Sequence, residues 1–91
     1  MINVGISSVK SFEFLFYPNP TTGKVNFETS LKNGYKSKII VYNILGKEVL
    51  TKEISTSNFN IDFSSMPEGI FTFKLMNSSI QYNGKIVYKK Q

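Results

Sequence analysis

The chain has 91 residues, of which 41% are hydrophobic and 19% are charged, and this length and composition are typical of one compact domain. It contains no cysteine and no histidine, which excludes disulfide scaffolds, thiolate and imidazole metal sites, and catalysis by Ser/His or Cys/His pairs. The formal net charge of +5 arises from 11 basic residues, all of them lysine and spread along the chain, so it indicates a solvated surface rather than nucleic-acid recognition, which favours arginine.

The first segment, residues 1–11, lacks hydrophobic periodicity and contains few large apolar side chains. It has neither the basic start nor the apolar stretch of a cleavable signal peptide, and the chain has no run of about twenty apolar residues long enough for a membrane helix. We therefore expect residues 1–11 to be a linker or an added lead-in, and residues 12–91 to form the folded domain.

The second segment, Tyr17-Pro18-Asn19-Pro20, combines two prolines that fix φ at alternate positions and hold the residues before them in extended geometry. It predicts a stiff extended stretch followed by a tight turn. Because proline has no amide hydrogen, a place at a strand's start or at a sheet edge is its ordinary explanation. A phosphate-binding loop at Thr22-Gly23-Lys24 is excluded, because Pro18 stands where that loop needs glycine and Val25 where it needs serine or threonine.

From there on, the chain consists of short segments in which apolar and polar residues mostly alternate, which is typical of strands with one buried face. The run Ile39-Ile40-Val41-Tyr42 does not alternate and predicts a central strand covered on both faces. In chain order, the candidate strands are Lys24–Glu28, Ile39–Tyr42, Lys47–Ile54, Asn58–Phe63, Ile70–Leu75 and Lys85–Lys89.

Turn residues separate these segments at short intervals. Asn33-Gly34 predicts a type I′ hairpin turn, since both residues tolerate positive φ. The stretch from Val41 to Val49 predicts a hairpin in which Gly46 is left-handed and Lys47 lies at the tip. Asn83-Gly84 leaves two alternatives open: a second hairpin, or a bulge inside one long final strand from Ile80 to Tyr88.

Closely spaced short strands predict an all-β sandwich or barrel. Its expected core, which suffices for a domain of this size without bridges or metals, comes from the inward positions of the candidate strands. The expected core residues are Val25, Phe27, Val41, Leu45, Val49, Ile61, Phe63, Phe71, Phe73, Leu75 and Ile86.

The remaining chemistry-bearing residues are six carboxylates, and they form neither a close pair nor a cluster suited to calcium. We therefore expect no catalytic residue, no cofactor and no metal. The acidic residues are Glu13, Glu28, Glu48, Glu53, Asp62 and Glu68.

Four stretches carry a family resemblance when they are taken in order: Tyr17-Pro18-Asn19-Pro20, then Val41-Tyr42-Asn43-Ile44-Leu45-Gly46-Lys47, then Met66-Pro67-Glu68-Gly69-Ile70-Phe71, then Gly84-Lys85-Ile86-Val87-Tyr88-Lys89-Lys90. Together they resemble the type A C-terminal sorting domain of the Bacteroidetes type IX (Por) secretion system, over about Phe14 to Gln91. The departures are Phe71, where tyrosine is common, and Asn83-Gly84 within the last strand.

The resemblance implies a non-catalytic, immunoglobulin-like antiparallel β-sandwich of about seven strands at the end of a larger exported protein. The partners it implies are the outer-membrane translocon, its shuttle proteins and a surface sortase that cuts in the lead-in between Val4 and Ser11. Passage through the periplasm to the cell surface or medium would follow. The family's cargo carries an N-terminal signal peptide, so we expect an excised fragment with an introduced Met1, separated from its cargo and monomeric.

The motif match also implies a partner-recognition surface, and the final strand from Lys85 to Lys90 is the expected edge for strand addition to a receptor. The residues carried over to this surface are Pro18, Asn19, Pro20, Gly46, Lys47, Gly69, Lys85, Lys89 and Lys90.

Two alternatives remain. One is a small sandwich module that binds carbohydrate or a protein surface, although the absence of tryptophan argues against an aromatic platform. The other is a basic nucleic-acid binder, which the scattered lysines do not favour and whose affinity would fall steeply with salt.

Overall fold

The computed structural model describes residues 5–9, 12–29, 36–78 and 81–90. Within these ranges the secondary structure is entirely β. The described residues therefore contain no candidate membrane-spanning helix. The strands are β1 (Gly5–Val9), β2 (Phe12–Tyr17), β3 (Lys24–Thr29), β4 (Ser37–Tyr42), β5 (Glu48–Ile54), β6 (Asn58–Asp62), β7 (Gly69–Met76) and β8 (Gln81–Tyr88).

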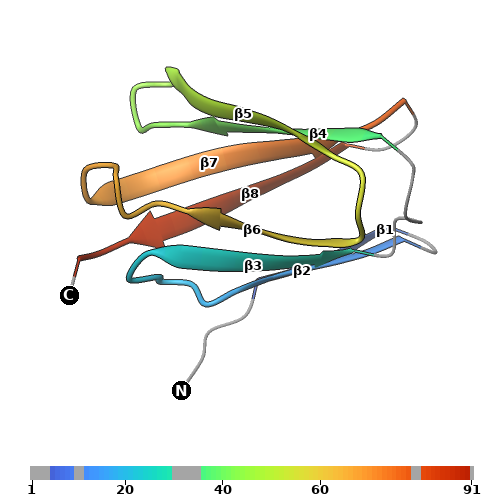
Figure 1. The fold of residues 1–91 in the computed structure, drawn as a ribbon, viewed down its shortest axis with the longest axis horizontal. Coiled ribbons are helices and arrows are strands. Elements are labelled where there is room, and N and C mark those ends of the chain that lie inside the picture. Colours follow the sequence, from blue (N-terminus) through green and yellow to red (C-terminus); the bar gives the residue numbers. More distant parts are fainter. Residues whose placement is uncertain (1–4, 10–11, 30–35, 79–80, 91) are drawn as a thin grey trace.

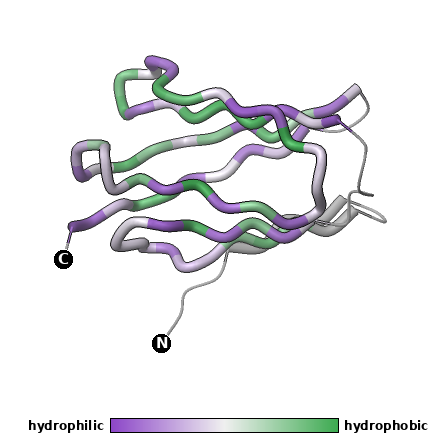
Figure 2. Tube along the Cα trace, viewed as in Figure 1, coloured by the Kyte–Doolittle hydropathy of each residue, from purple (hydrophilic) through white to green (hydrophobic). Residues whose placement is uncertain are grey.

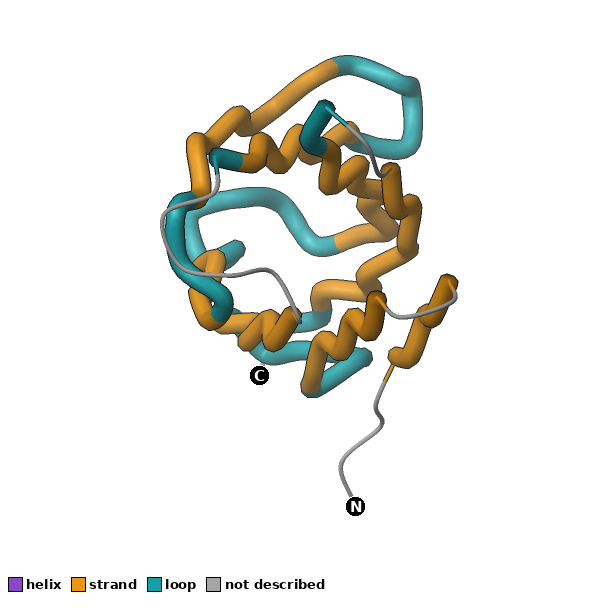
Figure 3. Tube along the Cα trace, turned by 90° about the vertical axis from the view of Figure 1, so that its right-hand side faces the viewer, coloured by secondary structure: helices purple, strands orange, loops and turns teal. Residues whose placement is uncertain are grey.

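The strands form two four-stranded antiparallel sheets, ordered β1-β2-β3-β6 and β5-β4-β7-β8. Seen along the strands, the two sheets face each other as the layers of a sandwich (Figure 3). The expected all-β antiparallel sandwich is thus confirmed, and strands β2 to β8 supply the seven strands expected within residues 12–91.

The core between the sheets is rich in aromatic rings. Phe27 lies near its centre, with its ring edge-on to Phe73 of the opposite sheet (centroids 5.4 Å apart) and stacked on Phe59 (4.8 Å). Nine of the expected core residues are buried: Val25, Phe27, Val41, Ile61, Phe63, Phe71, Phe73, Leu75 and Ile86. The sequence analysis did not include six others, namely Phe14, Phe16, Ile39, Ile54, Tyr82 and Tyr88.

Two of the residues expected in the core, Leu45 and Val49, lie outside it. Leu45 is 88% exposed because it lies in the turn beyond the end of β4, and Val49 is 38% exposed. The register of β4 with β5 shifts between Val41 and Tyr42, so that Leu50 lies opposite Val41 and packs against the core. Val49 therefore faces outward, because adjacent side chains of a strand point to opposite faces.

The centre of the second sheet also differs from expectation. β4 is a central strand between β5 and β7, as predicted, but it is not fully covered on both faces. Ile40 and Tyr42 on its outer face are only half-buried, and the ammonium group of Lys74 lies 5.9 Å from the centre of the Tyr42 ring.

The first two strands are a correction as well. β1 lies inside the expected lead-in and pairs with β2 from Gly5↔Phe16 to Val9↔Phe12. Neither strand was among the candidate segments. The sequence of β1 shows no apolar alternation, so no pattern predicted this strand. It pairs with β2, the next strand in the chain.

Neither alternative for Asn83-Gly84 is correct, because the final strand is long and regular. β8 runs unbroken past this pair, and its register with β7 shows no shift, so neither a hairpin nor a bulge forms there. A Cβ on Gly84 would lie 2.4 Å from Cζ of Phe73, so the glycine leaves room for that ring. The predicted Asn33-Gly34 turn lies outside the described residues, and the strands that flank it, β3 and β4, belong to different sheets.

Candidate recognition surface

The four motifs that are far apart in the sequence meet at one end of the sandwich (Figure 1). This end carries the β2–β3 connection, the β4–β5 turn, the β6–β7 connection and residues 89–90 after β8. The antiparallel order dictates the arrangement, because Lys24 pairs with Asp62, Tyr42 with Thr72, and Gly69 with Tyr88. We call this end, with its four segments, the motif end.

The segment Pro18–Thr21 is bound along the outer edge of β8. The side-chain amide of Asn19 donates to the carbonyl of Lys85 (2.9 Å), while its oxygen accepts from the amide of Val87 (2.9 Å). Thr21 continues the pairing with its backbone: its amide donates to the carbonyl of Val87 (2.8 Å) and its carbonyl accepts from the amide of Lys89 (2.9 Å). We refer to these four hydrogen bonds as the edge clamp.

The local structure of the segment explains why it holds this position. Both prolines follow cis peptide bonds. Proline has no amide hydrogen, so neither Pro18 nor Pro20 brings a backbone donor that would need a partner. The buried hydroxyl of Thr21 accepts from the amide of Gly23 (3.1 Å) and donates to the carbonyl of Lys24 (2.9 Å), which closes the turn into β3. The expected position at a sheet edge and the turn that follows it are confirmed, whereas Asn19 and Pro20 lie in a bend and not in the extended stretch that was expected.

The edge clamp corrects the expectation that the final strand offers its edge to a receptor. The backbone groups of Lys85, Val87 and Lys89 that point away from β7 are already bonded to Asn19 and Thr21. An incoming strand would have to displace them. The sequence could not reveal this, because Asn19 lies 66 and 68 residues from its two partners.

The β4–β5 turn is organised by Asn43. Its side-chain oxygen accepts from the amides of Leu45 and Lys47 (3.0 Å each), and its carbonyl accepts from the amide of Gly46 (2.9 Å). Gly46 has a φ of 83°, so the predicted left-handed glycine is confirmed. The predicted position of Lys47 at the tip is wrong: its backbone is hydrogen-bonded to Asn43 at the base of the turn, next to the start of β5, and its side chain is exposed.

The β6–β7 connection completes the motif end. The carboxylate of Asp62 accepts from both the hydroxyl (2.7 Å) and the amide (2.9 Å) of Ser64, and these bonds hold the pKa of Asp62 below its ordinary value. Gly69 has a φ of 154°, a conformation that disfavours other residues. Glu68 accepts from the amide of Lys90 (2.7 Å), which ties this connection to the residues after β8.

The expected recognition residues thus fall into three groups. Asn19 is used within the edge clamp, and Lys85 and Lys89 contribute backbone groups to it while their side chains are exposed. Gly46 and Lys47 lie in a separate turn at the same end. Pro18 and Pro20 lie in the β2–β3 connection, Gly69 is the first residue of β7, and Lys90 follows β8.

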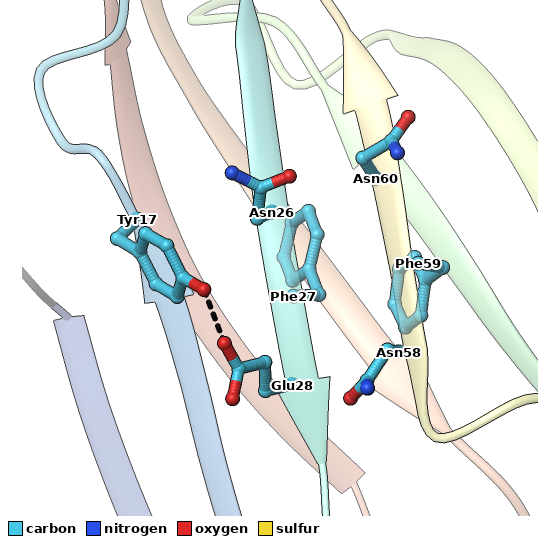
Figure 4. Close-up of a pocket in the computed structure, with 7 residues that line it drawn as sticks. All are labelled: Tyr17, Asn26, Phe27, Glu28, Asn58, Phe59 and Asn60. Carbon is cyan, nitrogen blue, oxygen red and sulfur yellow. Dashed lines mark hydrogen bonds between the residues drawn. The ribbon is translucent and has the colours of Figure 1, made fainter.

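A shallow depression of about 300 Å³ lies elsewhere, on the outer face of β2, β3 and β6. Figure 4 shows Tyr17 and Glu28 on one side of it and the amides of Asn26, Asn58 and Asn60 beside them. The Tyr17 hydroxyl donates to the Glu28 carboxylate, and this bond raises the pKa of Tyr17. The group offers hydrogen bonds but no second carboxylate for acid–base catalysis, and the sequence analysis did not predict it.

No group of three Asp or Glu side chains in the described ranges is arranged to hold a metal ion. The titratable groups of the motif end are lysines and single carboxylates held in turns. Such an arrangement can bind and orient a partner.

Comparison with known protein families gives one match. The family model described as "Secretion system C-terminal sorting domain" matches residues 15–89, which run from within β2 to just past β8 and cover the first three motifs and the fourth as far as Lys89. A search among curated proteins found no match.

Proposed function

The chain belongs to the family of secretion system C-terminal sorting domains, and from that premise we propose that it acts as an address read by the type IX machinery of the outer membrane. Membership implies export to the cell surface or the extracellular space, and the family is generally non-catalytic. The proposed partners are the translocon with its shuttle proteins, a sortase at the surface, and a cargo domain joined to the N-terminal side.

The observation that carries the proposal is the family match over residues 15–89. The fold adds support, because segments separated by up to about seventy residues in the chain assemble into one end of the molecule. An address of this kind has to fold independently and present its signal on one surface, and the sandwich supplies its own buried core for this purpose.

Recognition by strand addition along β8 is no longer the preferred mode, because the edge clamp occupies that edge. We propose instead that the receptor reads the side chains of the motif end, including Lys47, Lys89 and Lys90, together with Lys85 on the adjoining part of β8, all of them exposed. In this proposal Asn19 and Gly69 shape the surface, and Pro18 and Pro20 hold the clamp in position.

We further propose that sortase cleavage takes place outside β1. The segment expected to contain the cut, from Val4 to Ser11, includes the strand Gly5–Val9, which is hydrogen-bonded to β2. A protease binds its substrate as an extended chain, so a cut within β1 would require that strand to be released first. The proposed cut therefore lies outside Gly5–Val9.

A secretion assay tests the proposed function. A reporter protein with a signal peptide is fused to residues 1–91 and expressed in a bacterium that has the type IX apparatus, in an otherwise identical strain without its translocon, and without the tail. Only the fusion in the intact strain should reach the surface or medium. Export without the tail, or export in the strain without the translocon, would refute the proposal, and so would retention of the complete fusion in the intact strain.

The carbohydrate-binding alternative can be tested with the same purified chain on a glycan array, where a sorting domain should bind no polysaccharide. Nucleic-acid binding would give affinity that declines with salt in a filter-binding series.

A further inference from the structure

The motif end concentrates exposed apolar side chains on one sheet. Among the described residues, the large hydrophobic side chains with the highest exposure are Ile44 (75%), Leu45 (88%), Val49 (38%) and Ile70 (39%). Ile44 and Leu45 form the β4–β5 turn, Val49 follows on β5, and Ile70 lies at the start of β7. Figure 2 shows the hydrophobic colouring of this turn where it projects from the sandwich. We call Ile44 and Leu45 the apolar tip.

The outer face of the sheet continues this patch. Tyr42 pairs with Thr72, so the chain that continues from β4 towards Ile44 runs beside Ile70, which in turn pairs with Val87. Ile70 and Val87 point outward, since their neighbours Phe71 and Ile86 are buried in the core. Contiguous exposed apolar groups of this kind mark interaction sites more often than isolated ones do.

The apolar tip is also held in one conformation before any partner arrives. The hydrogen bonds from the amides of Leu45 and Lys47 to the Asn43 side chain, and from Gly46 to the Asn43 carbonyl, fix the backbone that carries it. A pre-ordered anchor loses little conformational entropy on binding, and central apolar anchors contribute most of the affinity of protein interfaces. Nothing in the core of the domain requires these two side chains to be apolar, because both are exposed.

We propose that the apolar tip inserts into an apolar pocket of a protein of the secretion machinery, and that carboxylates at the rim of that pocket pair with Lys47 and Lys85. This inference rests on the proposed function and names the contact through which the address is read. Charge complementarity supports it, because Lys47, Lys89 and Lys90 at this end and Lys85 on β8 are exposed and the chain carries a net charge of +5.

A protein partner fits this surface better than an anionic membrane. The carboxylates of Glu48 and Glu68 lie among the lysines of the motif end, and they would be repelled by anionic headgroups. A fixed turn suits a shaped pocket, whereas insertion into lipid requires no particular shape. A mixed-charge rim around an apolar centre is the usual composition of a protein–protein contact.

The test compares Ile44→Thr/Leu45→Thr with two controls in the reporter fusion: Ile44→Leu/Leu45→Ile, which keeps the tip apolar, and Met76→Thr, which removes an apolar group at the opposite end of the same sheet. Secretion should fall by about tenfold or more in the threonine variant and stay close to wild type in both controls. Each purified chain is first shown to be folded by its melting temperature.

Unchanged secretion of the folded threonine variant would overturn the inference and leave the proposed function intact, whereas failure of the wild-type fusion would refute the proposed function itself. Free tail co-expressed with the reporter provides a second readout. The wild-type tail should compete with the reporter for export, and the threonine variant should not. Equal competition by both would also overturn the inference.

Vesicles of phosphatidylcholine and phosphatidylglycerol test the lipid alternative. The purified wild-type chain should not sediment with them. Sedimentation that is lost in Ile44→Thr/Leu45→Thr would assign the tip to a membrane and contradict the protein partner.

Discussion

The edge clamp and the apolar tip lie at the same end of the sandwich and both belong to the sequence motifs, yet they serve different purposes. The clamp is directed inward: Asn19 and Thr21 use their hydrogen-bonding groups to cover the edge of β8. The tip is directed outward: Asn43 fixes a turn whose apolar side chains have no place in the core. Neighbouring motifs can therefore have different physical roles: the edge clamp contributes to stability, and the apolar tip has the recognition role proposed above.

This comparison makes separable predictions. Substitutions around β8 and its clamp should lower the free energy of unfolding, whereas substitution of the apolar tip should leave it nearly unchanged and affect only recognition.

The largest loss of stability is expected for Gly84→Ala, on the strand that the clamp covers. The new Cβ would lie 2.4 Å and 2.5 Å from ring atoms of the buried Phe73. Overfilling a packed core in this way should lower the free energy of unfolding by about 3 kcal/mol, measured by urea denaturation. Gly23→Ala is the matched control, because its Cβ would meet no atom closer than 3.7 Å. Equal effects of the two substitutions would contradict the close approach at Gly84.

The next largest loss is expected for Asn19→Ala, which breaks the clamp directly. It removes two hydrogen bonds and leaves the amide of Val87 and the carbonyl of Lys85 without them, at a cost of about 2 kcal/mol. Asn60→Ala, at an exposed position on the outer face of β6, should change stability by no more than about 0.5 kcal/mol.

Asn19→Ala has a second readout. Because an uncovered edge can pair with another chain, the variant should self-associate at concentrations at which the wild type sediments as a monomer. A monomeric variant of unchanged stability would show that the clamp does not protect the edge.

The clamp also shows what the sequence can and cannot predict. Alternation identified β3, β6 and β7, a run of β-branched and aromatic residues identified β4, and the glycine of the β4–β5 turn predicted its left-handed residue. The partner of Asn19 could not be predicted, because alternation describes the faces of a strand and carries no information on which strand lies beside it. Leu45 and Val49 were placed in the core because they are apolar, but exposure is decided by the end of β4 and the register shift at Val41.

The candidate site was predictable to a similar degree. The four motifs supplied its segments, and their family resemblance is confirmed by the match over residues 15–89. The exposed apolar tip was missed, although its signal was present: two aliphatic residues stand between a turn-forming asparagine and a glycine, where no strand can bury them. The convergence of the motifs at one end required the antiparallel order of both sheets.

A smaller effect is expected at the tip side, for Gly46→Ala. No atom lies within 4 Å of the added Cβ, so the cost arises only from the φ of 83° and should be about 1 kcal/mol. Gly46→Asn should cost less, because asparagine tolerates this conformation better. Thermal denaturation of both variants checks the order. A greater loss for asparagine than for alanine would indicate that the turn is disturbed sterically rather than conformationally.

The smallest effect on stability is expected from the titration of Asp62, at the end of β6 beside the β6–β7 connection, which is the third segment of the motif end. Hydrogen bonds from Ser64 lower its pKa below the ordinary value of a carboxyl group, so its ionised form is favoured by folding. This contribution to stability is present above the unfolded pKa and is lost as the pH falls through the lower, folded value. Ser64→Ala removes the hydrogen bond from the hydroxyl and should raise the pKa of Asp62, while the control Ser65→Ala should leave that pKa unchanged. The pKa of Asp62 in each variant is measured from its carboxyl carbon signal, followed by NMR between neutral and acidic pH. An unchanged pKa in Ser64→Ala would mean that the Ser64 hydroxyl does not hold this carboxylate. The shape of the third segment would then depend on backbone contacts such as the hydrogen bond from the Phe63 amide to the Gly23 carbonyl.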